Sequence, residues 1–262
     1  LSLGRYDVPF GIERHDEPLL LTATTSDIFR YGRPQFVTGF RAAYMFNPMI
    51  DMDLFLVNRW ESETTEDSFN DNNGAKTYGG RIGLTPLPTG DLLNFGIGGF
   101  YGAEQDDTGS PKRWVLDFDL TWTPLPKLLL SGEFVRGGEA NVSMRERGIP
   151  FPTPAVTDQY VQWWGFSLLS HYEANDWLGL SLRYGYFDDI DGARTGVPQR
   201  LQNITFAPIV HLSKLIPDLG GTGATYPRTG LPINWVDLKV EYRYNFSNKA
   251  VFADVGQGVP VL

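Results

Sequence analysis

Apolar and polar residues alternate along most of the chain with a period of two, the spacing of a β-strand that has two different faces. In residues 113–122 the even positions from 114 are Trp, Leu, Phe, Leu and Trp, whereas the odd positions from 115 to 121 are Val, Asp, Asp and Thr. In residues 235–245 the even positions are Val, Leu, Val, Tyr and Tyr, against Asp, Lys, Glu, Arg and Asn at the odd positions from 237. Because desolvating so many charges is costly, the polar faces need water.

The alternation predicts eleven strands, which are joined in turn by short corners and by long polar segments. The strands are expected at about 1–8, 35–46, 50–61, 76–87, 92–103, 113–122, 128–136, 161–173, 177–187, 202–214 and 235–245. The long connections are expected at 9–34, 62–75, 104–112, 137–160 and 188–201. Short corners such as "TPLPK" are rich in turn-forming residues. One segment, 215–233, is long where a short turn is due and is interpreted as an inserted loop.

Long strands with this order of connections are typical of an outer-membrane barrel. The predicted fold is therefore all-β, a transmembrane antiparallel up-and-down β-barrel with its apolar face in lipid and its charged face in a lumen. Tryptophans near strand ends would form the interfacial girdles: Trp60, Trp114, Trp122, Trp177 and Trp235. A soluble β-sandwich or lectin is the alternative, but its strands average about five or six residues and its connections do not alternate in length.

Composition removes several classes of function. The 262 residues carry a formal net charge of −9, which argues against a nucleic-acid-binding surface. They include no cysteine, which excludes disulfides, thiol catalysis, cysteine-ligated zinc, iron–sulfur clusters and attached c-type haem in this chain. The longest apolar runs, such as "AAYMF", are far shorter than the roughly 20 residues of a transmembrane helix. The chain starts at Leu1 inside an expected strand, which suggests a processed or incomplete N-terminus.

Four stretches carry a resemblance to a known family: "GRYDVPFGIE" at 4–13, "VNRWESETTEDSFNDNNGAKTYGGRIG" at 57–83, "WWGFSLLSHYEANDWLGLSLRYGYFDDIDGARTG" at 163–196 and "VEYRYNFSNKAVF" at 240–252. Together they resemble the OmpL-like β-barrel porins of Gram-negative outer membranes. Members of that family usually carry more strands before the first stretch and an aromatic residue at the end of the last strand. The resemblance thus implies a single outer-membrane β-barrel domain over 1–262 that lacks N-terminal strands and the last strand, with 12 to 16 strands in the full protein.

The charged strand faces supply the candidate pore-lining residues. They are Arg41, Asp51, Asp53, Arg59, Glu61, Arg81, Asp117, Asp119, Glu133, Arg183, Asp237, Lys239, Glu241 and Arg243, together with Arg5 and Asp7 on the first strand. Charges of both signs on neighbouring strands suit a diffusion pore whose field selects solutes. Cross-strand ion pairs in a plugged lumen are the alternative, but the pore is favoured because a barrel of 12 or more strands is wider than side chains alone can fill.

Other candidate chemistry is weak. Residues 137–160 are a candidate constriction loop with Arg145, Glu146 and Arg147 at its eyelet, or else a surface loop. "DDIDGAR" at 188–194 and "NDNNG" at 70–74 resemble fragments of calcium loops but lack the ligand spacing, so solvated turns are favoured. His171 and His211 share the lumen parity, and no catalytic motif is present. No enzymatic activity, cofactor or metal site is predicted.

The predicted function is an outer-membrane porin with a water-filled channel for passive diffusion of small hydrophilic solutes or ions. The alternative is a non-conducting barrel that acts as a scaffold, an adhesin or a sheath around a partner such as an electron-transfer protein. A hydrolase ranks below both, since it would need a Ser and a His brought together across strands. The expected partners are outer-membrane lipid and small solutes, with no nucleic acid; a homo-oligomer or an outer-membrane complex partner stays open.

Overall fold

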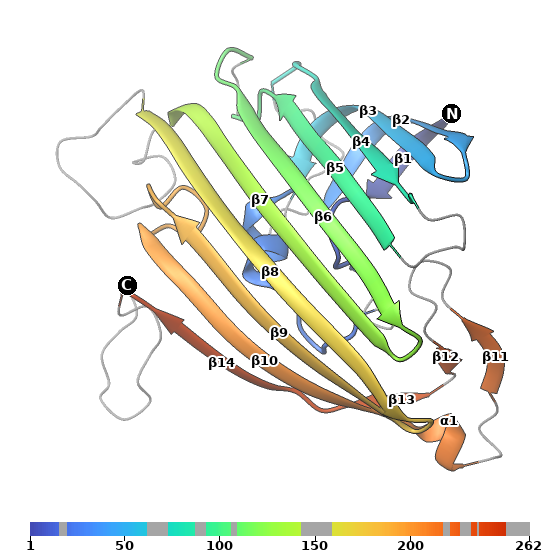
Figure 1. Cartoon of the computed structure of the whole chain (residues 1–262). Helices are drawn as coiled ribbons and strands as arrows, with labels where there is room; N and C mark the ends of the chain where they lie inside the picture. Colours follow the sequence, from blue (N-terminus) through green and yellow to red (C-terminus); the bar gives the residue numbers. More distant parts are fainter. Residues whose placement is uncertain are drawn as a thin grey trace.

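Most of the described chain lies in one curved antiparallel sheet of 12 strands (Figure 1). The computed structural model describes residues 1–15, 20–61, 73–86, 93–105, 109–142, 159–216, 221–225, 232–234 and 236–249. The strands of this sheet are β1 (Ser2–Asp7), β2 (Phe36–Asn47), β3 (Ile50–Glu61), β4 (Thr77–Leu84), β5 (Leu93–Gly102), β6 (Arg113–Leu125), β7 (Leu128–Val142), β8 (Gln159–Asn175), β9 (Leu178–Asp189), β10 (Gln199–His211), β13 (Asp237–Lys239) and β14 (Tyr242–Ser247).

Neighbours in sequence are neighbours in the sheet from β1 to β10, so the up-and-down order is confirmed. The strand expected at 235–245 is divided into β13 and β14, which pair with β10 in one continuous register. The division lies beside Pro208 of β10, which has no backbone N–H to donate to the ladder. Among the described residues, β1 and the β13–β14 edge are not paired with each other.

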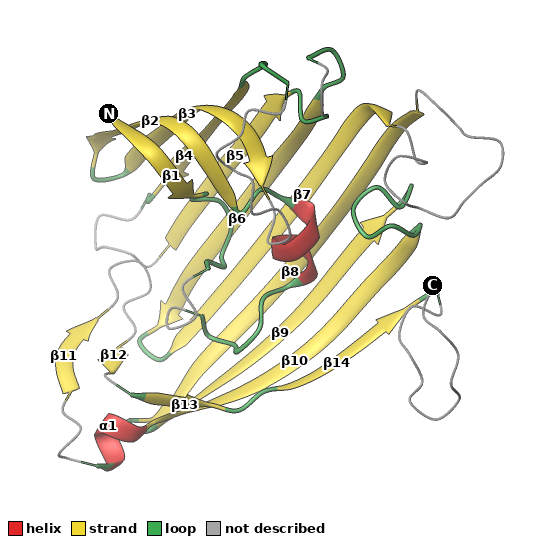
Figure 2. Cartoon of the chain, turned by 180° about the vertical axis from the view of Figure 1, so that it is seen from behind, coloured by secondary structure: helices red, strands yellow, loops and turns green. Residues whose placement is uncertain are grey.

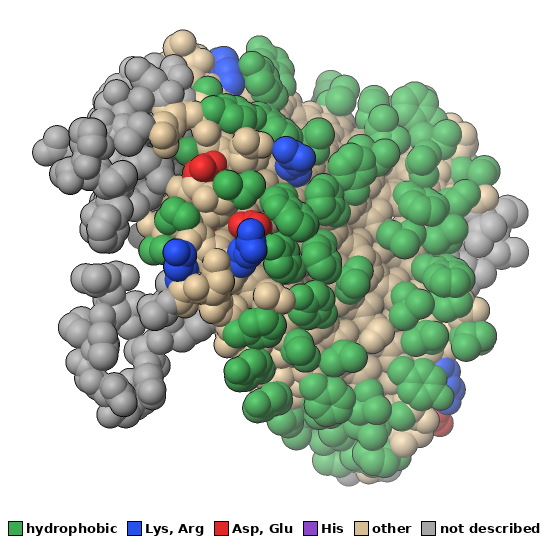
Figure 3. Space-filling model, turned by 60° about the vertical axis from the view of Figure 1, so that its left-hand side comes forward, with side chains coloured by type: hydrophobic (Ala, Val, Ile, Leu, Met, Phe, Trp, Pro, Cys, Tyr) green, Lys and Arg blue, Asp and Glu red, His purple; other side chains and the backbone are tan. Residues whose placement is uncertain are grey.

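The two faces of the sheet differ as the alternation predicts. In β6, Leu116 and Phe118 are 45% and 43% exposed, whereas Asp117 and Asp119 are 0% and 8% exposed. Side chains on the convex surface are mostly apolar, as the space-filling view shows for one side of the sheet (Figure 3). The charged face is the concave one, hereafter the interior face.

Trp60 departs from the predicted alternation. Trp60 pairs with Val37 of β2, whereas Val57 pairs with Gly39 of β2. Two residues of β3 therefore lie opposite one residue of β2, and β3 has one extra residue between Val57 and Trp60. This bulge reverses the parity of the strand end. Trp60 is 4% exposed and belongs to the interior core, and its assignment to an interfacial girdle was wrong.

Several expected boundaries also shift. β7 extends to Val142 and β8 starts at Gln159, so the connection predicted at 137–160 is shorter. The strand expected at 202–214 ends at His211 and continues into the helix α1 (Leu212–Leu215). The 215–233 segment contains a two-stranded sheet of β11 (Gly221–Thr225) and β12 (Pro232–Asn234).

The long connection between β1 and β2 lies on the concave side of the sheet (Figure 2). It includes the short π-helix η2 (Ile28–Gly32), which contacts β7, β8 and β9. The sequence pattern predicted that this connection is one of the long outer loops. That prediction was wrong, because the connection lies inside the curve of the sheet (Figure 2). In the part of the chain that the structure describes, no helix has the length and apolarity to cross a membrane.

Candidate functional site in the lumen

The interior face carries nearly all the charged residues predicted to line a pore. Asp53, Arg81, Asp117, Asp119, Glu133 and Arg183 are buried; Arg41, Asp51, Arg59, Lys239, Glu241 and Arg243 are half-buried; Asp237 is exposed. Arg59 lies in the β3 bulge. Arg5 lies on the same face of β1 as Leu3, which is 69% exposed, so the prediction that Arg5 faces the lumen was wrong. The side chain of Glu61 and the residues Arg145, Glu146 and Arg147 lie outside the described residues.

The connection over residues 8–35, hereafter the lumen segment, packs on the interior face through an apolar cluster. Phe10 lies with its ring centroid 5.2 Å from that of Phe100 in β5. Val8 and Ile28 join the same cluster, whose members on the sheet include Trp163 of β8. The Trp163 indole N–H donates to the carbonyl of Gly32 at 2.8 Å. The segment is therefore held by a small hydrophobic core of its own inside the sheet.

A buried ion pair holds the same half of the lumen segment to β7. Arg33 Nε donates to Glu133 Oε1 at 2.8 Å, and both side chains are 0% exposed. The backbone N–H of Ile12 donates to the other oxygen of Glu133 at 2.9 Å. Burial by itself would lower the pKa of the Arg33 guanidinium, but the carboxylates of Glu133, Asp117, Asp7 and Glu13 outweigh it and raise that pKa. Arg33 is thus a permanent cation in the lumen.

Gly11 lets the segment approach this ion pair closely. Its φ is +69°, in the left-handed region that favours glycine, and a Cβ at this position would lie 2.2 Å from the Glu133 carboxylate. No other residue type fits here without displacing Glu133.

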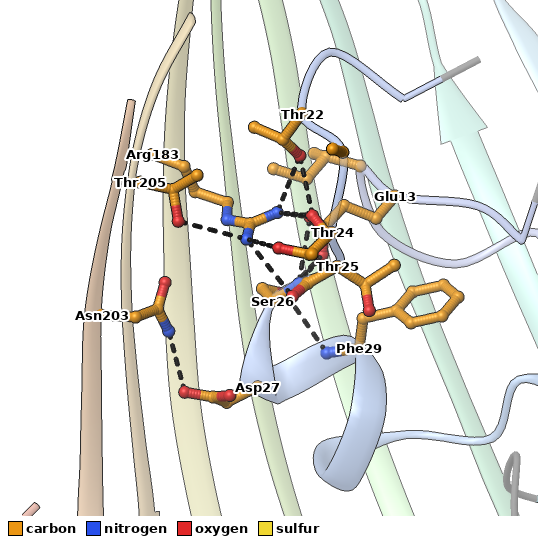
Figure 4. Close-up of polar contacts among 12 residues, drawn as sticks. Glu13, Thr22, Thr24, Thr25, Ser26, Asp27, Phe29, Arg183, Asn203 and Thr205 are labelled. Carbon is orange, nitrogen blue, oxygen red and sulfur yellow. Dashed lines mark hydrogen bonds and ion pairs between the residues drawn. The ribbon is translucent and has the colours of Figure 1, made fainter. Parts of the chain in front are cut away.

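The second half of the lumen segment docks on β9 and β10 through polar groups (Figure 4). Arg183 of β9 forms an ion pair with Glu13 and donates to the hydroxyl of Thr22 at 2.9 Å. Its other terminal nitrogen donates to the carbonyl of Thr25 at 3.2 Å. Because the Arg183 side chain is 0% exposed, these contacts replace the water that its two terminal nitrogens would otherwise bind.

The edge strands contact the segment as well. Arg243 of β14 donates to Asp27 at 2.8 Å, and the amide of Asn203 in β10 donates to the same carboxylate at 2.8 Å. Glu241 accepts from the backbone N–H groups of Ala23 and Thr24 at 2.7 Å and 3.0 Å. The lumen segment therefore reaches from β1 and β2 across the concave face to β14.

Two arginines flank Trp60 at the end of the lumen where the long connections lie. Arg113 and Arg194 place their guanidinium carbons 5.2 Å and 5.3 Å from its ring centroid. Arg194 also donates to the carbonyl of Tyr31 at 2.6 Å. Nearby, Glu104 accepts from the backbone N–H of Trp60 at 2.7 Å, and burial raises the pKa of the Glu104 carboxyl.

A chain of hydrogen bonds crosses the interior face near the short turns. The Ser181 hydroxyl lies 2.8 Å from His171 Nδ1, and His171 Nε2 lies 3.2 Å from Glu173. His211 Nε2 lies 3.1 Å from the second oxygen of Glu173, and its Nδ1 lies 2.7 Å from Asp237. The lumen parity predicted for both histidines is confirmed.

This cluster brings a Ser and a His together across strands, as a hydrolase would need. Ser181 and His171 are each 1% exposed, however, and both ring nitrogens of His171 already have partners. A substrate has no access to the Ser181 hydroxyl in this arrangement. The cluster therefore joins strands in the way that buried polar networks usually do.

The calcium-like stretch at 188–194 forms ordinary turn contacts. Asp189 accepts from the backbone N–H groups of Arg194 and Thr195 at 2.9 Å and 2.6 Å, so its carboxylate closes its own turn. Among the residues that the structure describes, no group of three or more His, Asp or Glu could hold a metal ion.

The sequence pattern did not predict that residues 8–35 fold into the lumen. A usable signal was present, because Val8, Phe10, Leu20, Ile28 and Phe29 are more apolar residues than a solvated loop needs. All five are buried in the structure. The loop at 137–160, for which a constriction and a surface position were both open, lies mostly outside the described residues.

The comparisons with known proteins agree with this architecture. Residues 1–258 match the model of a protein family described as "Putative beta-barrel porin-2, OmpL-like". The chain belongs to this porin family. The resemblance inferred from the four sequence stretches is thereby confirmed, and the porin assignment explains why apolar side chains cover the outer face of the sheet.

A solved structure shares the fold of this porin. The outer membrane channel DcaP of Acinetobacter baumannii aligns with a TM-score of 0.56 and 11% sequence identity, over 93% of the porin chain and 64% of DcaP. At this identity the similarity concerns the fold alone, and the porin chain spans about two thirds of the length of DcaP. None of the curated proteins matches the sequence.

Proposed function

We propose that the full-length porin forms a water-filled channel across the outer membrane of a Gram-negative cell, through which small hydrophilic solutes or ions diffuse passively. The observation that carries this proposal is the contrast between an apolar convex face and an interior face lined with charged groups, from Asp51 on β3 to Arg243 on β14. Lipid would bathe the first face and water the second. The short turns would face the periplasm and the long connections the cell exterior.

In this channel the lumen segment is the narrowing element. It is built on residues 8–35, whereas the candidate constriction loop at 137–160 lies mostly outside the described residues. Its contacts with Glu133, Arg183 and Arg243 come from β7, β9 and β14, so it crosses the lumen and does not follow one strand. Solutes would pass between this segment and the strands that it does not cover. We expect no catalytic turnover.

A non-conducting barrel is the second candidate, and one specific observation favours it. The ion pairs between Arg33 and Glu133 and between Arg183 and Glu13 are almost fully buried, as expected of a segment that closes a lumen permanently. Such a barrel would serve as a scaffold, an adhesin or a sheath around an outer-membrane partner.

Planar-bilayer recording separates the two candidates. The full-length protein, refolded and reconstituted, is expected to produce stepwise conductance. A variant in which residues 16–27 are replaced by a short Gly/Ser linker should conduct more, since the narrowing element is reduced. If the full-length protein is silent and the linker variant conducts, the segment is a permanent plug and the second candidate holds. If both are silent, the channel proposal is wrong.

A further inference from the structure

The interior charges near the short turns are not balanced one to one. Hereafter the short-turn mouth denotes the interior groups of Asp51, Arg81, Asp119, Glu173, His211 and Asp237. We propose that this mouth carries a net negative charge and makes the channel selective for cations over anions. The inference rests on the proposed function as a channel and names its class of solute.

The first half of the mouth places two carboxylates on one guanidinium. Arg81 Nη2 lies 3.2 Å from Asp119, and Arg81 Nη1 lies 3.7 Å from Asp51. The Asp51 side chain is 40% exposed, whereas those of Arg81 and Asp119 are 6% and 7% exposed. The buried pair of Arg81 and Asp119 is therefore neutral as a unit, and the accessible carboxylate of Asp51 adds a negative charge beside lumen water.

The second half repeats this arrangement with an imidazole. Both ring nitrogens of His211 face carboxylate oxygens, at 3.1 Å for Glu173 and 2.7 Å for Asp237. Carboxylates only accept hydrogen bonds, so each ring nitrogen must carry a proton and His211 is a cation. The Asp237 side chain is 26% exposed. Two carboxylates again share one cation.

The remaining contacts of this half leave that balance unchanged. His171 faces Glu173 through Nε2 and the Ser181 hydroxyl through Nδ1, and these two contacts need only one ring proton together with the hydroxyl proton. Ser181 supplies no charge from β9. Glu173, His211 and Asp237 thus sum to one negative charge. Lys239, on the same face, donates instead to the carbonyl of Leu20 in the lumen segment, where Glu241 docks beside it and balances its charge.

Other ion pairs along the described interior face match one cation with one carboxylate. They are Arg41 with Asp53, Arg113 with Glu139, Arg183 with Glu13 and Arg243 with Asp27. Farther inside, Arg33 faces both Glu133 and Asp117, but these three side chains are buried and do not line the lumen. The accessible excess of carboxylates is thus concentrated at the short-turn mouth. A confined, low-dielectric passage lined by one sign of charge concentrates counter-ions, so cations enter it more readily than anions.

The test is the reversal potential of the full-length protein in a planar bilayer under a KCl gradient. We expect the sign that corresponds to K⁺ preference, with a smaller preference at high ionic strength because salt screens the mouth. Asp51→Asn should shift the reversal potential toward zero, since Arg81 keeps its closer partner Asp119 and the fold is retained. Asp237→Asn should shift it in the same direction.

Asp188→Asn is the matched control. Asp188 lies on the outer face of β9, where it pairs with Arg200 at 3.2 Å, so the same charge is removed outside the lumen. Its reversal potential should equal that of the unsubstituted protein. A conducting channel that prefers Cl⁻, or that shows no preference, would overturn this inference and leave the channel itself intact. An Asp51→Asn variant that folds and keeps full K⁺ preference would also overturn it. A silent bilayer would instead overturn the proposed function.

Discussion

The ion pair between Arg33 and Glu133 gives the sharpest test of how the lumen segment is held. Both side chains are 0% exposed, and removing one partner of such a pair typically costs about 3–5 kcal/mol because the other charge stays buried. In Arg33→Met, Glu133 would keep only the N–H of Ile12 as a partner among the contacts described above. We therefore expect the segment to lose about 3–5 kcal/mol of docking free energy.

Two further variants isolate the charge effect. The double variant Arg33→Met with Glu133→Leu removes both charges and should lie closer to the unsubstituted protein than Arg33→Met alone. Arg14→Met breaks a pair in which the Arg14 and Asp7 side chains are 29% and 28% exposed, so its effect should stay below about 1 kcal/mol.

The assay combines urea unfolding in lipid vesicles with limited proteolysis of the folded protein. Tryptophan fluorescence reports undocking, since Trp163 is bonded to Gly32 of the segment. If the segment leaves before the sheet unfolds, the effect of Arg33→Met will appear as faster cleavage within residues 8–35. The reasoning is refuted if Arg33→Met matches the unsubstituted protein within about 0.5 kcal/mol and is cleaved no faster.

Three other substitutions test separate features of the fold. Trp60→Ala should destabilise the protein by about 3–5 kcal/mol in urea unfolding, because the side chain is buried in the interior core. Trp122→Ala should cost less, since that side chain is 43% exposed on the outer face. Equal effects would contradict the placement of Trp60 in the core. Gly11→Ala forces an L-residue to φ +69° at about 1–2 kcal/mol and places a methyl group against Glu133, so proteolysis of the segment should accelerate. Phe118→Arg puts a charge on the outer face in the middle of β6 and should cost about 2–4 kcal/mol in lipid vesicles; a neutral result would argue that lipid does not contact this face.

The lumen segment combines two kinds of contact that respond differently to conditions. Phe10 and Ile28 pack in an apolar cluster, whereas Asp27 is held by polar and ionic contacts to β10 and β14. Salt screens ion pairs more strongly when they are exposed, and Arg243 is the less buried anchor, with a side chain 18% exposed against 0% for Arg183. The part of the segment near β14 is therefore the part that high salt should loosen first.

The sequence by itself determined the strands, their order and their orientation. A period of two is a local property, because successive side chains of any strand point to opposite faces. The burial of Asp117 and the exposure of Phe118 could thus be predicted from parity alone. Where a bulge interrupts the pairing, as before Trp60, parity reverses and the prediction fails.

Only the tertiary structure decided what occupies the lumen. Arg33 and Glu133 are 100 residues apart and Glu13 and Arg183 are 170 apart, and no local pattern links residues at such separations. Their pairing depends on how far the sheet curves and on where residues 8–35 lie, which only the packing of the whole chain fixes. The polar pattern predicted charges facing water, and the fold turned many of them toward one another.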